Sequence, residues 1–209
     1  ENLGRALLAR GRFQEARSCI RAVRQTGSGP TQVWVHLLRS ELELLGGDPS
    51  AAQRELSAAR ALGAAEEPLS FNHYVAISAA VAAAEGNWRD VFTVVRDGLQ
   101  DVHGETTDIR RVQVAVELAR VLDDVPPGDD RTELLEALLQ VANTAAERIR
   151  KRVGKRVIPF VPVVIQEIGR RLGDLSGDPG EPSWEDVAVA WQHDGNRIRE
   201  MRARIKAVE

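Results

Sequence analysis

The residues that could perform chemistry lie far apart in this sequence. Its histidines are His36, His73, His103 and His193. The closest two of them are 30 positions apart, and none lies in an H-E-x-x-H motif or beside a cysteine that could share a zinc ion. In the single Gly-Lys pair, Gly154-Lys155, Arg156 follows where a phosphate-binding loop needs Ser or Thr. We therefore expect no metal, no nucleotide and no other cofactor.

Catalytic arrangements are also missing from the sequence pattern. No Gly-x-Ser-x-Gly nucleophile elbow occurs, and no acid/base pair is placed to activate a nucleophile. Cys19 follows Ala16 by three positions and precedes Val23 by four, which places it toward an apolar helix face. We interpret it as a structural thiol, with a reactive thiol as the alternative. The prediction is a protein that is not an enzyme, the rival being a hydrolase or transferase without a recognisable motif.

One run of basic residues stands out, with six positive charges in the nine positions 148–156. They are Arg148, Arg150, Lys151, Arg152, Lys155 and Arg156. No aromatic side chain interleaves with them, as would be expected for nucleic-acid binding. We favour a solvated helix end, where cations interact well with the helix dipole, over a phosphate-binding patch.

The composition of the chain excludes further classes of partner. The chain has 209 residues, 43% of them hydrophobic, and a formal charge of -3, which suits neither nucleic acid nor an anionic membrane surface. No apolar stretch approaches the roughly 18 residues of a membrane span. A single cysteine fits a reducing compartment, so we expect a cytoplasmic protein with no membrane partner.

Three glycine-centred turns organise the elements that must position these residues. The marker glycines Gly11, Gly47 and Gly86 are 36 and 39 residues apart. Apolar residues with helical spacing flank each turn, and a small or branched apolar residue follows each glycine by five positions. Such short helices cannot bury an apolar face alone, so neighbouring hairpins must stack on one another. The pattern predicts an all-α protein built as an α-solenoid of antiparallel helix hairpins.

The repeats become weaker and less regular from about residue 107 onward. We expect helices over 109–122, 131–152, from Pro159 or Pro162 to about Leu172, 184–193 and 198–208. The β-branched residues of 157–165 leave a strand as the alternative there, although prolines three apart disfavour a central one. On one helix, Trp184, Ala188 and Trp191 share a face and are expected to form hairpin core. In total we expect about eleven helices in a single helical-repeat domain over 1–209.

The first repeats resemble the tetratricopeptide repeat. Leu3-Gly4-x-x-Leu7, the turn at Gly11 and Ala16-x-x-x-Ile20 follow its signals in order. Ser40 and Ala79 take the small-residue position in the next two repeats. The resemblance implies that Gly4 lets the second helix approach the first closely.

The C-terminal stretch is similar to the repeat regions of large actinobacterial LuxR-type transcriptional regulators, which carry an N-terminal ATPase and a C-terminal helix-turn-helix. The residues that carry this likeness are Trp184 to Trp191, Gly195 and Ala203-Arg204, whereas Val208-Glu209 departs from it. The resemblance implies that the chain is a fragment of a longer regulator, in a segment that senses inducers or partner proteins. A free-standing tetratricopeptide-like interaction scaffold unrelated to transcription is the alternative.

In an α-solenoid the first helices of successive hairpins line the concave surface. Extrapolating the register of the repeats places seven residues there: Arg5, Trp34, Leu37, Glu41, His73, Ala76 and Ala80. We expect this face to bind a partner protein, a peptide or a small inducer, and expect no direct nucleic-acid binding by this segment.

Overall fold

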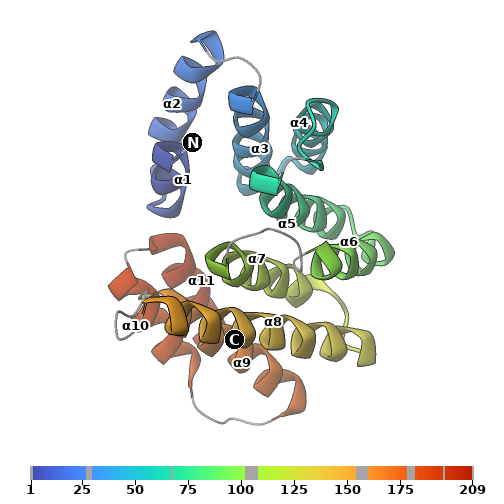
Figure 1. Cartoon of the computed structure of the whole chain (residues 1–209), viewed down its shortest axis with the longest axis vertical. Helices are drawn as coiled ribbons and strands as arrows, with labels where there is room; N and C mark the ends of the chain where they lie inside the picture. Colours follow the sequence, from blue (N-terminus) through green and yellow to red (C-terminus); the bar gives the residue numbers. More distant parts are fainter. Residues whose placement is uncertain are drawn as a thin grey trace. The chain divides into compact units, whose positions relative to one another are not determined.

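The computed structural model of this chain describes residues 2–26, 30–66, 68–101, 108–153, 160–177, 182–194 and 196–208. Over these residues it contains eleven α-helices, one short 3-10 helix and no strand, which confirms the expected all-α class (Figure 1). The elements are α1 (Asn2–Ala9), α2 (Phe13–Thr26), α3 (Pro30–Leu45), α4 (Pro49–Ala61), α5 (Pro68–Ala84), α6 (Trp88–Asp101), α7 (Asp108–Val121), η1 (Leu122–Asp124), α8 (Asp129–Val153), α9 (Phe160–Ser176), α10 (Trp184–Asp194) and α11 (Arg197–Val208).

The helices gather into two compact units. Unit 1 comprises Glu1–Val94 and unit 2 comprises Val95–Glu209, with the boundary inside α6. The single repeat domain over 1–209 stays a prediction, and each unit is described by itself. Among the described helices, none combines the length and the apolar composition that crossing a membrane requires.

The three marker glycines end helices in the same way. Gly11, Gly47 and Gly86 have positive φ angles of 68°, 78° and 72°, a conformation that glycine adopts without a steric penalty. Each glycine N–H donates to the carbonyl three residues earlier, and the next N–H donates to the carbonyl five residues earlier. These paired bonds form the Schellman motif, which satisfies the last carbonyls of a helix. The predicted turns are therefore helix ends set by backbone conformation.

Helix starts follow local rules as well. The Ala51 N–H donates to Asp48 Oδ1 at 2.8 Å and caps α4, whose first residue is a proline. Pro162 lies in the first turn of α9, which continues to Ser176, four residues beyond the predicted end. The strand alternative is wrong for residues 160–165, and 157–159 lie outside the described residues. A proline in the first helical turn loses no hydrogen bond, which explains why the segment around Pro162 forms a helix.

In unit 1, α3 lies next to four other helices, α1, α2, α4 and α5. A Cβ atom added to Gly4 would lie 3.0 Å from Leu38 Cδ1, so the missing side chain at Gly4 makes room for α3. This differs from the expectation that Gly4 admits the second helix of its own hairpin. In the next repeat, the Ser40 hydroxyl donates to the Ala52 carbonyl at 2.8 Å and joins α3 closely to α4.

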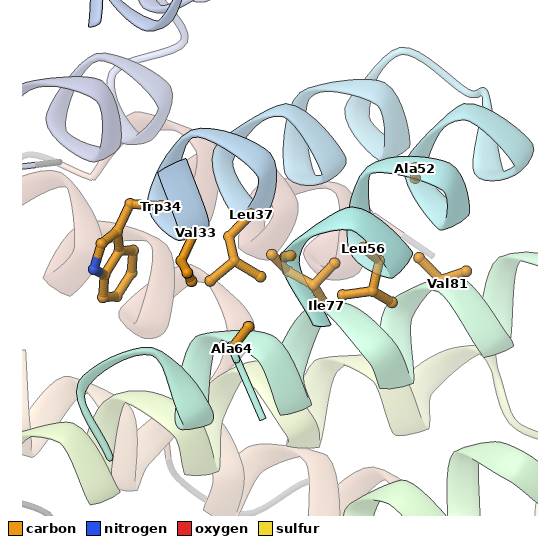
Figure 2. Packing of buried hydrophobic residues seen from close by; sticks show 9 residues of the cluster. Val33, Trp34, Leu37, Ala52, Leu56, Ala64, Ile77 and Val81 are labelled. Carbon is orange, nitrogen blue, oxygen red and sulfur yellow. The ribbon is translucent and has the colours of Figure 1, made fainter. Parts of the chain in front are cut away.

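The main core of unit 1 lies where α3, α4 and α5 meet. Figure 2 shows Leu37, Leu56 and Ile77 converging from these three helices, with Trp34 at one end of the group. The cluster consists of Val33, Trp34, Leu37, Ala52, Leu56, Ala59, Ala64, Ile77 and Val81. Because no one of these helices buries its apolar face alone, the packing of successive helices stabilises all three.

Unit 2 is built on α7, α8 and α9, each of which packs on the other two. Helix α10 packs on α9, and α11 on α10. Trp184, Ala188 and Trp191 of α10 are buried, which confirms the prediction that they form core. Large side chains, Leu118, Leu135 and Ile168 among them, fill this core.

Candidate functional site

Three of the residues predicted to bind a partner meet between α3 and α5. The Trp34 indole stacks on the His73 imidazole, with ring centroids 5.8 Å apart and planes inclined by 29°. His73 Nε2 lies 3.4 Å from Glu41 Oε2. Trp34 and Glu41 are seven residues apart on α3, which places them on one helix face two turns from each other. We call Trp34, Glu41 and His73 the α3–α5 face.

Polar atoms on this part of α5 are incompletely satisfied. His73 Nε2 is buried and makes no hydrogen bond, since its approach to Glu41 lacks hydrogen-bond geometry. The side-chain nitrogen of Asn72 is also buried without a hydrogen bond. Buried polar groups without partners are unfavourable, so these two nitrogens lower the stability of this part of unit 1. Glu41 keeps 35% of its side chain exposed and is the accessible charged group of the face.

Burial removes several of the predicted residues from an accessible surface, including Trp34, which is only 9% exposed and belongs to the core of unit 1. Leu37 is fully buried in the core and Ala76 is also buried, so both support the α3–α5 face from within unit 1. Ala80 is half-buried. The side chain of Arg5 lies outside the described residues.

A second polar group in unit 1 was missed by sequence reasoning. Glu55 of α4 receives a hydrogen bond from His36 Nδ1 at 2.7 Å and pairs with Arg39 Nη2 at 2.7 Å. The sequence feature that could have indicated this group is the spacing of His36 and Arg39, which are three residues apart and share a face of α3. Their partner lies on another helix, and side-chain spacing along one helix does not identify it.

Unit 2 contains a buried carboxylate that joins three helices. Glu167 of α9 accepts two hydrogen bonds from the Arg120 guanidinium of α7, both at 2.7 Å. It also accepts the indole N–H of Trp191 from α10 at 2.5 Å, and Arg171 lies 3.2 Å away. A carboxylate offers about four lone-pair directions, and the three hydrogen bonds use most of them, while Arg171 Nη1 makes an ion pair without hydrogen-bond geometry. Glu167 is therefore occupied by its own structure and is not free to act on a substrate.

The charges around Glu167 continue into a network that spans unit 2. Glu117 of α7 binds Arg199 of α11, whose guanidinium lies 4.4 Å from the centroid of the Trp191 ring. On the other side, Arg171 pairs with Asp123 at 2.8 Å. The network consists of Glu117, Arg120, Asp123, Glu167, Arg171 and Arg199. It ties α11 to α7 and α7 to α9.

The pKa values of the carboxyl groups in this network move in two directions. Burial raises the pKa of Glu167, but Arg120 and Arg171 outweigh burial and hold it below its usual value. The same balance, with Arg199 and Arg120 as the cations, holds the pKa of Glu117 below its usual value. For Asp123, burial is the larger effect and raises the pKa despite Arg171. The network thus holds two carboxylates ionised and disfavours ionisation of a third.

No arrangement for metal binding appears among the described residues, where no three His, Cys, Asp or Glu side chains are placed to hold an ion together. Comparisons with known proteins add no relative: no family model, no curated protein and no solved structure matches this chain.

Proposed function

We propose that this chain is a non-catalytic helical-repeat module of a bacterial LuxR-type transcriptional regulator, which binds a partner protein, a peptide or a small inducer on the α3–α5 face. The observation that carries the proposal is the contact of Trp34, Glu41 and His73. They come from helices that the sequence pattern makes the first helices of two successive hairpins. Residues predicted separately to face a partner thus converge in one place.

The order of packing in unit 1 supports the repeat interpretation. Helix α3 lies beside α1 and beside α5, so the first helices of the three predicted hairpins are neighbours. In a tetratricopeptide-like stack these helices line the concave surface. The proposal therefore places binding on the surface that this architecture exposes to a ligand.

The chemistry of the face suits a ligand with a cationic part. Trp34 is buried in the core of unit 1 and stacks on His73, so it supports the face from within. The Glu41 carboxylate, with 35% of its side chain exposed, would attract a cationic group of the ligand. Binding would favour one form of the parent regulator by its differential affinity for that form.

Site-specific photo-crosslinking in cells tests this assignment. A benzoylphenylalanine at Ala80 of α5 should form an adduct with the partner, whereas the same group at exposed Gln53 of α4 should not. Glu41→Gln should weaken the adduct at Ala80, and Glu43→Gln, two residues away on α3, should leave it unchanged. Equal adducts at Ala80 and Gln53, insensitive to Glu41→Gln, would show that the α3–α5 face does not bind the partner.

For a small inducer the readout is the melting temperature of the purified chain. An inducer that raises the melting temperature of the wild type should raise that of Glu41→Gln less, because binding to the folded state stabilises it in proportion to affinity. Sequencing the parent reading frame tests the assignment to a regulator. A Gly-x-x-x-x-Gly-Lys-Ser/Thr loop upstream and a helix-turn-helix downstream would support it, and a start and a stop codon immediately flanking the chain would leave the free-standing scaffold.

A further inference from the structure

The basic run at the end of α8 does not simply extend into solvent. Arg152 Nη1 lies 3.2 Å from Asp108 Oδ2, and Arg148 Nη1 lies 3.7 Å from Asp108 Oδ1. Asp108 is the first residue of α7, and its side chain is only 4% exposed. The end of α8 and the start of α7 therefore meet at one carboxylate, which forms ion pairs, without hydrogen bonds, with two arginines of the basic run.

This carboxylate already has a partner on its own helix. Arg111 Nη1 lies 3.1 Å from Asp108 Oδ1, in the i,i+3 arrangement that neighbouring turns favour. One negative charge is thus shared by three guanidinium groups, so Arg148 and Arg152 together bring more positive charge than Asp108 can balance. Both remain accessible, with 49% and 70% of their side chains exposed.

We propose that Arg148 and Arg152 form a binding site for the terminal phosphoryl group of a small molecule. Each approaches Asp108 through Nη1 and keeps about half or more of its side chain exposed, so the planar group can also meet an acceptor from solvent. Guanidinium groups bind phosphate oxygens through two parallel N–H bonds, and such charge-assisted bonds are short and strong. The nearby N-terminus of α7 adds a favourable potential for an anion.

A single phosphoryl group fits this arrangement better than a nucleic-acid backbone. Two arginines four residues apart lie about one helical turn from each other, which spans one phosphoryl group. Nucleic-acid surfaces present several cations along a groove, usually with aromatic side chains, and no aromatic residue accompanies this run. Asp108 acts as a positioning residue, because it orients the two guanidinium groups without contacting the ligand.

The site lies in unit 2 and does not rest on the function proposed for unit 1. Variants at Arg148 and Arg152 leave Trp34, Glu41 and His73 unchanged. Loss of phosphate binding and loss of partner binding are therefore separate results.

Isothermal titration of the whole chain with inorganic phosphate, at constant ionic strength set by sodium chloride, tests the proposal. Replacing both Arg148 and Arg152 by alanine should weaken phosphate binding by a factor of roughly ten or more, because charge-assisted hydrogen bonds are lost. Arg150→Ala is the matched control: it removes an exposed arginine from the same turn of α8, on another face, and should change affinity by less than about twofold. Circular dichroism establishes that each variant remains folded.

Replacing both arginines by lysine separates geometry from charge. Lysine keeps the positive charges but lacks the planar fork, so phosphate affinity should fall below wild type and stay above the double alanine variant. Equal losses from Arg150→Ala and from the double alanine variant would overturn the proposal, as would lysine variants that bind phosphate as tightly as wild type. Absence of phosphate binding by the folded wild-type chain would also overturn it.

A second experiment distinguishes a small-molecule phosphoryl group from a nucleic-acid phosphate. Fluorescence anisotropy with a single-stranded and a duplex oligonucleotide, titrated at several salt concentrations, measures nucleic-acid binding and its salt dependence. Weak oligonucleotide binding that phosphate displaces supports a small-molecule site. Tight oligonucleotide binding with a steep salt dependence, which phosphate does not displace, would assign the arginines to a nucleic-acid surface instead.

Discussion

At the scale of single residues, the buried charges of unit 2 depend strongly on their partners. Arg120 and Glu167 are 8% and 3% exposed at their side chains, and each satisfies the other through paired hydrogen bonds. Removing ions from water costs several kcal/mol, and only well-placed partners offset this cost. Such residues can specify how α7, α9 and α10 fit together, because a shifted helix would leave a charge buried without its partner.

Replacing Glu167 by glutamine should destabilise the fold by about 3 to 5 kcal/mol, because Arg120 would remain buried without its charge partner. Urea unfolding followed by circular dichroism measures the change in free energy. Glu136→Gln, at an exposed position of α8, is the control and should change stability by less than about 0.5 kcal/mol. If the two variants were equally stable, Glu167 would not hold these helices together.

At the scale of elements, glycine in the left-handed conformation follows the ends of α1, α3, α4 and α5 in unit 1. Gly47 has φ 78°, and an added Cβ would meet no atom within 4 Å. A substitution there changes backbone strain without causing a clash. The same paired hydrogen bonds follow Gly63, where α4 ends, so this device also separates successive hairpins.

Gly47→Ala should therefore lower stability by about 1 to 2 kcal/mol, the cost of the left-handed conformation for a residue with a Cβ. Gly128→Ala is a matched control, because its Cβ would also meet nothing within 4 Å and its φ is not positive. There the smaller entropy of the unfolded chain should leave stability unchanged or slightly raised. Thermal unfolding of the two variants, with wild type as reference, compares these outcomes. A Gly47→Ala protein as stable as Gly128→Ala would contradict the role of the turn.

At the scale of the whole molecule, the ionic network should make the fold sensitive to acid. A carboxyl group whose pKa is lowered in the folded state stabilises the fold above its unfolded pKa, about 4.3 for glutamate. That contribution is lost as pH falls toward the folded pKa. Glu117 and Glu167 both act in this direction. Asp123 acts in the opposite direction, because its raised pKa means that the fold gains stability on its protonation.

Glu117, Glu167 and Asp186 have lowered pKa values, whereas those of Asp123 and Asp194 are raised. Because three groups oppose two, we expect the free energy of unfolding to decrease as pH falls below about 4.3. Urea unfolding at a series of pH values measures this decrease. In Glu167→Gln the decrease should be shallower, since one group with a lowered pKa has been removed. An identical pH dependence in wild type and variant would mean that Glu167 titrates alike in the folded and unfolded chain.

The sequence by itself determined the helical class, the helix count and the glycine turns. These features follow from local rules: the 3.6-residue period of apolar positions, the preference of glycine for positive φ, and the place of proline in a first turn. The core role of Trp184 and Trp191 was also predictable, because it follows from their position on one helix face. Trp34, Glu41 and His73 lie together, and their role in binding a partner stays a prediction.

Only the tertiary structure decided which distant residues meet. Arg120 and Glu167 are 47 positions apart, and Glu117 and Arg199 are 82 apart, so no local pattern pairs them. Trp34 and Leu37 share a helix face with Glu41, yet the packing of α4 and α5 buries both in the core. Likewise, two arginines of the basic run form ion pairs with Asp108, a residue 40 positions before Arg148. Pairings of this kind depend on how helices pack, because contact between helices brings together side chains that sequence spacing leaves unrelated.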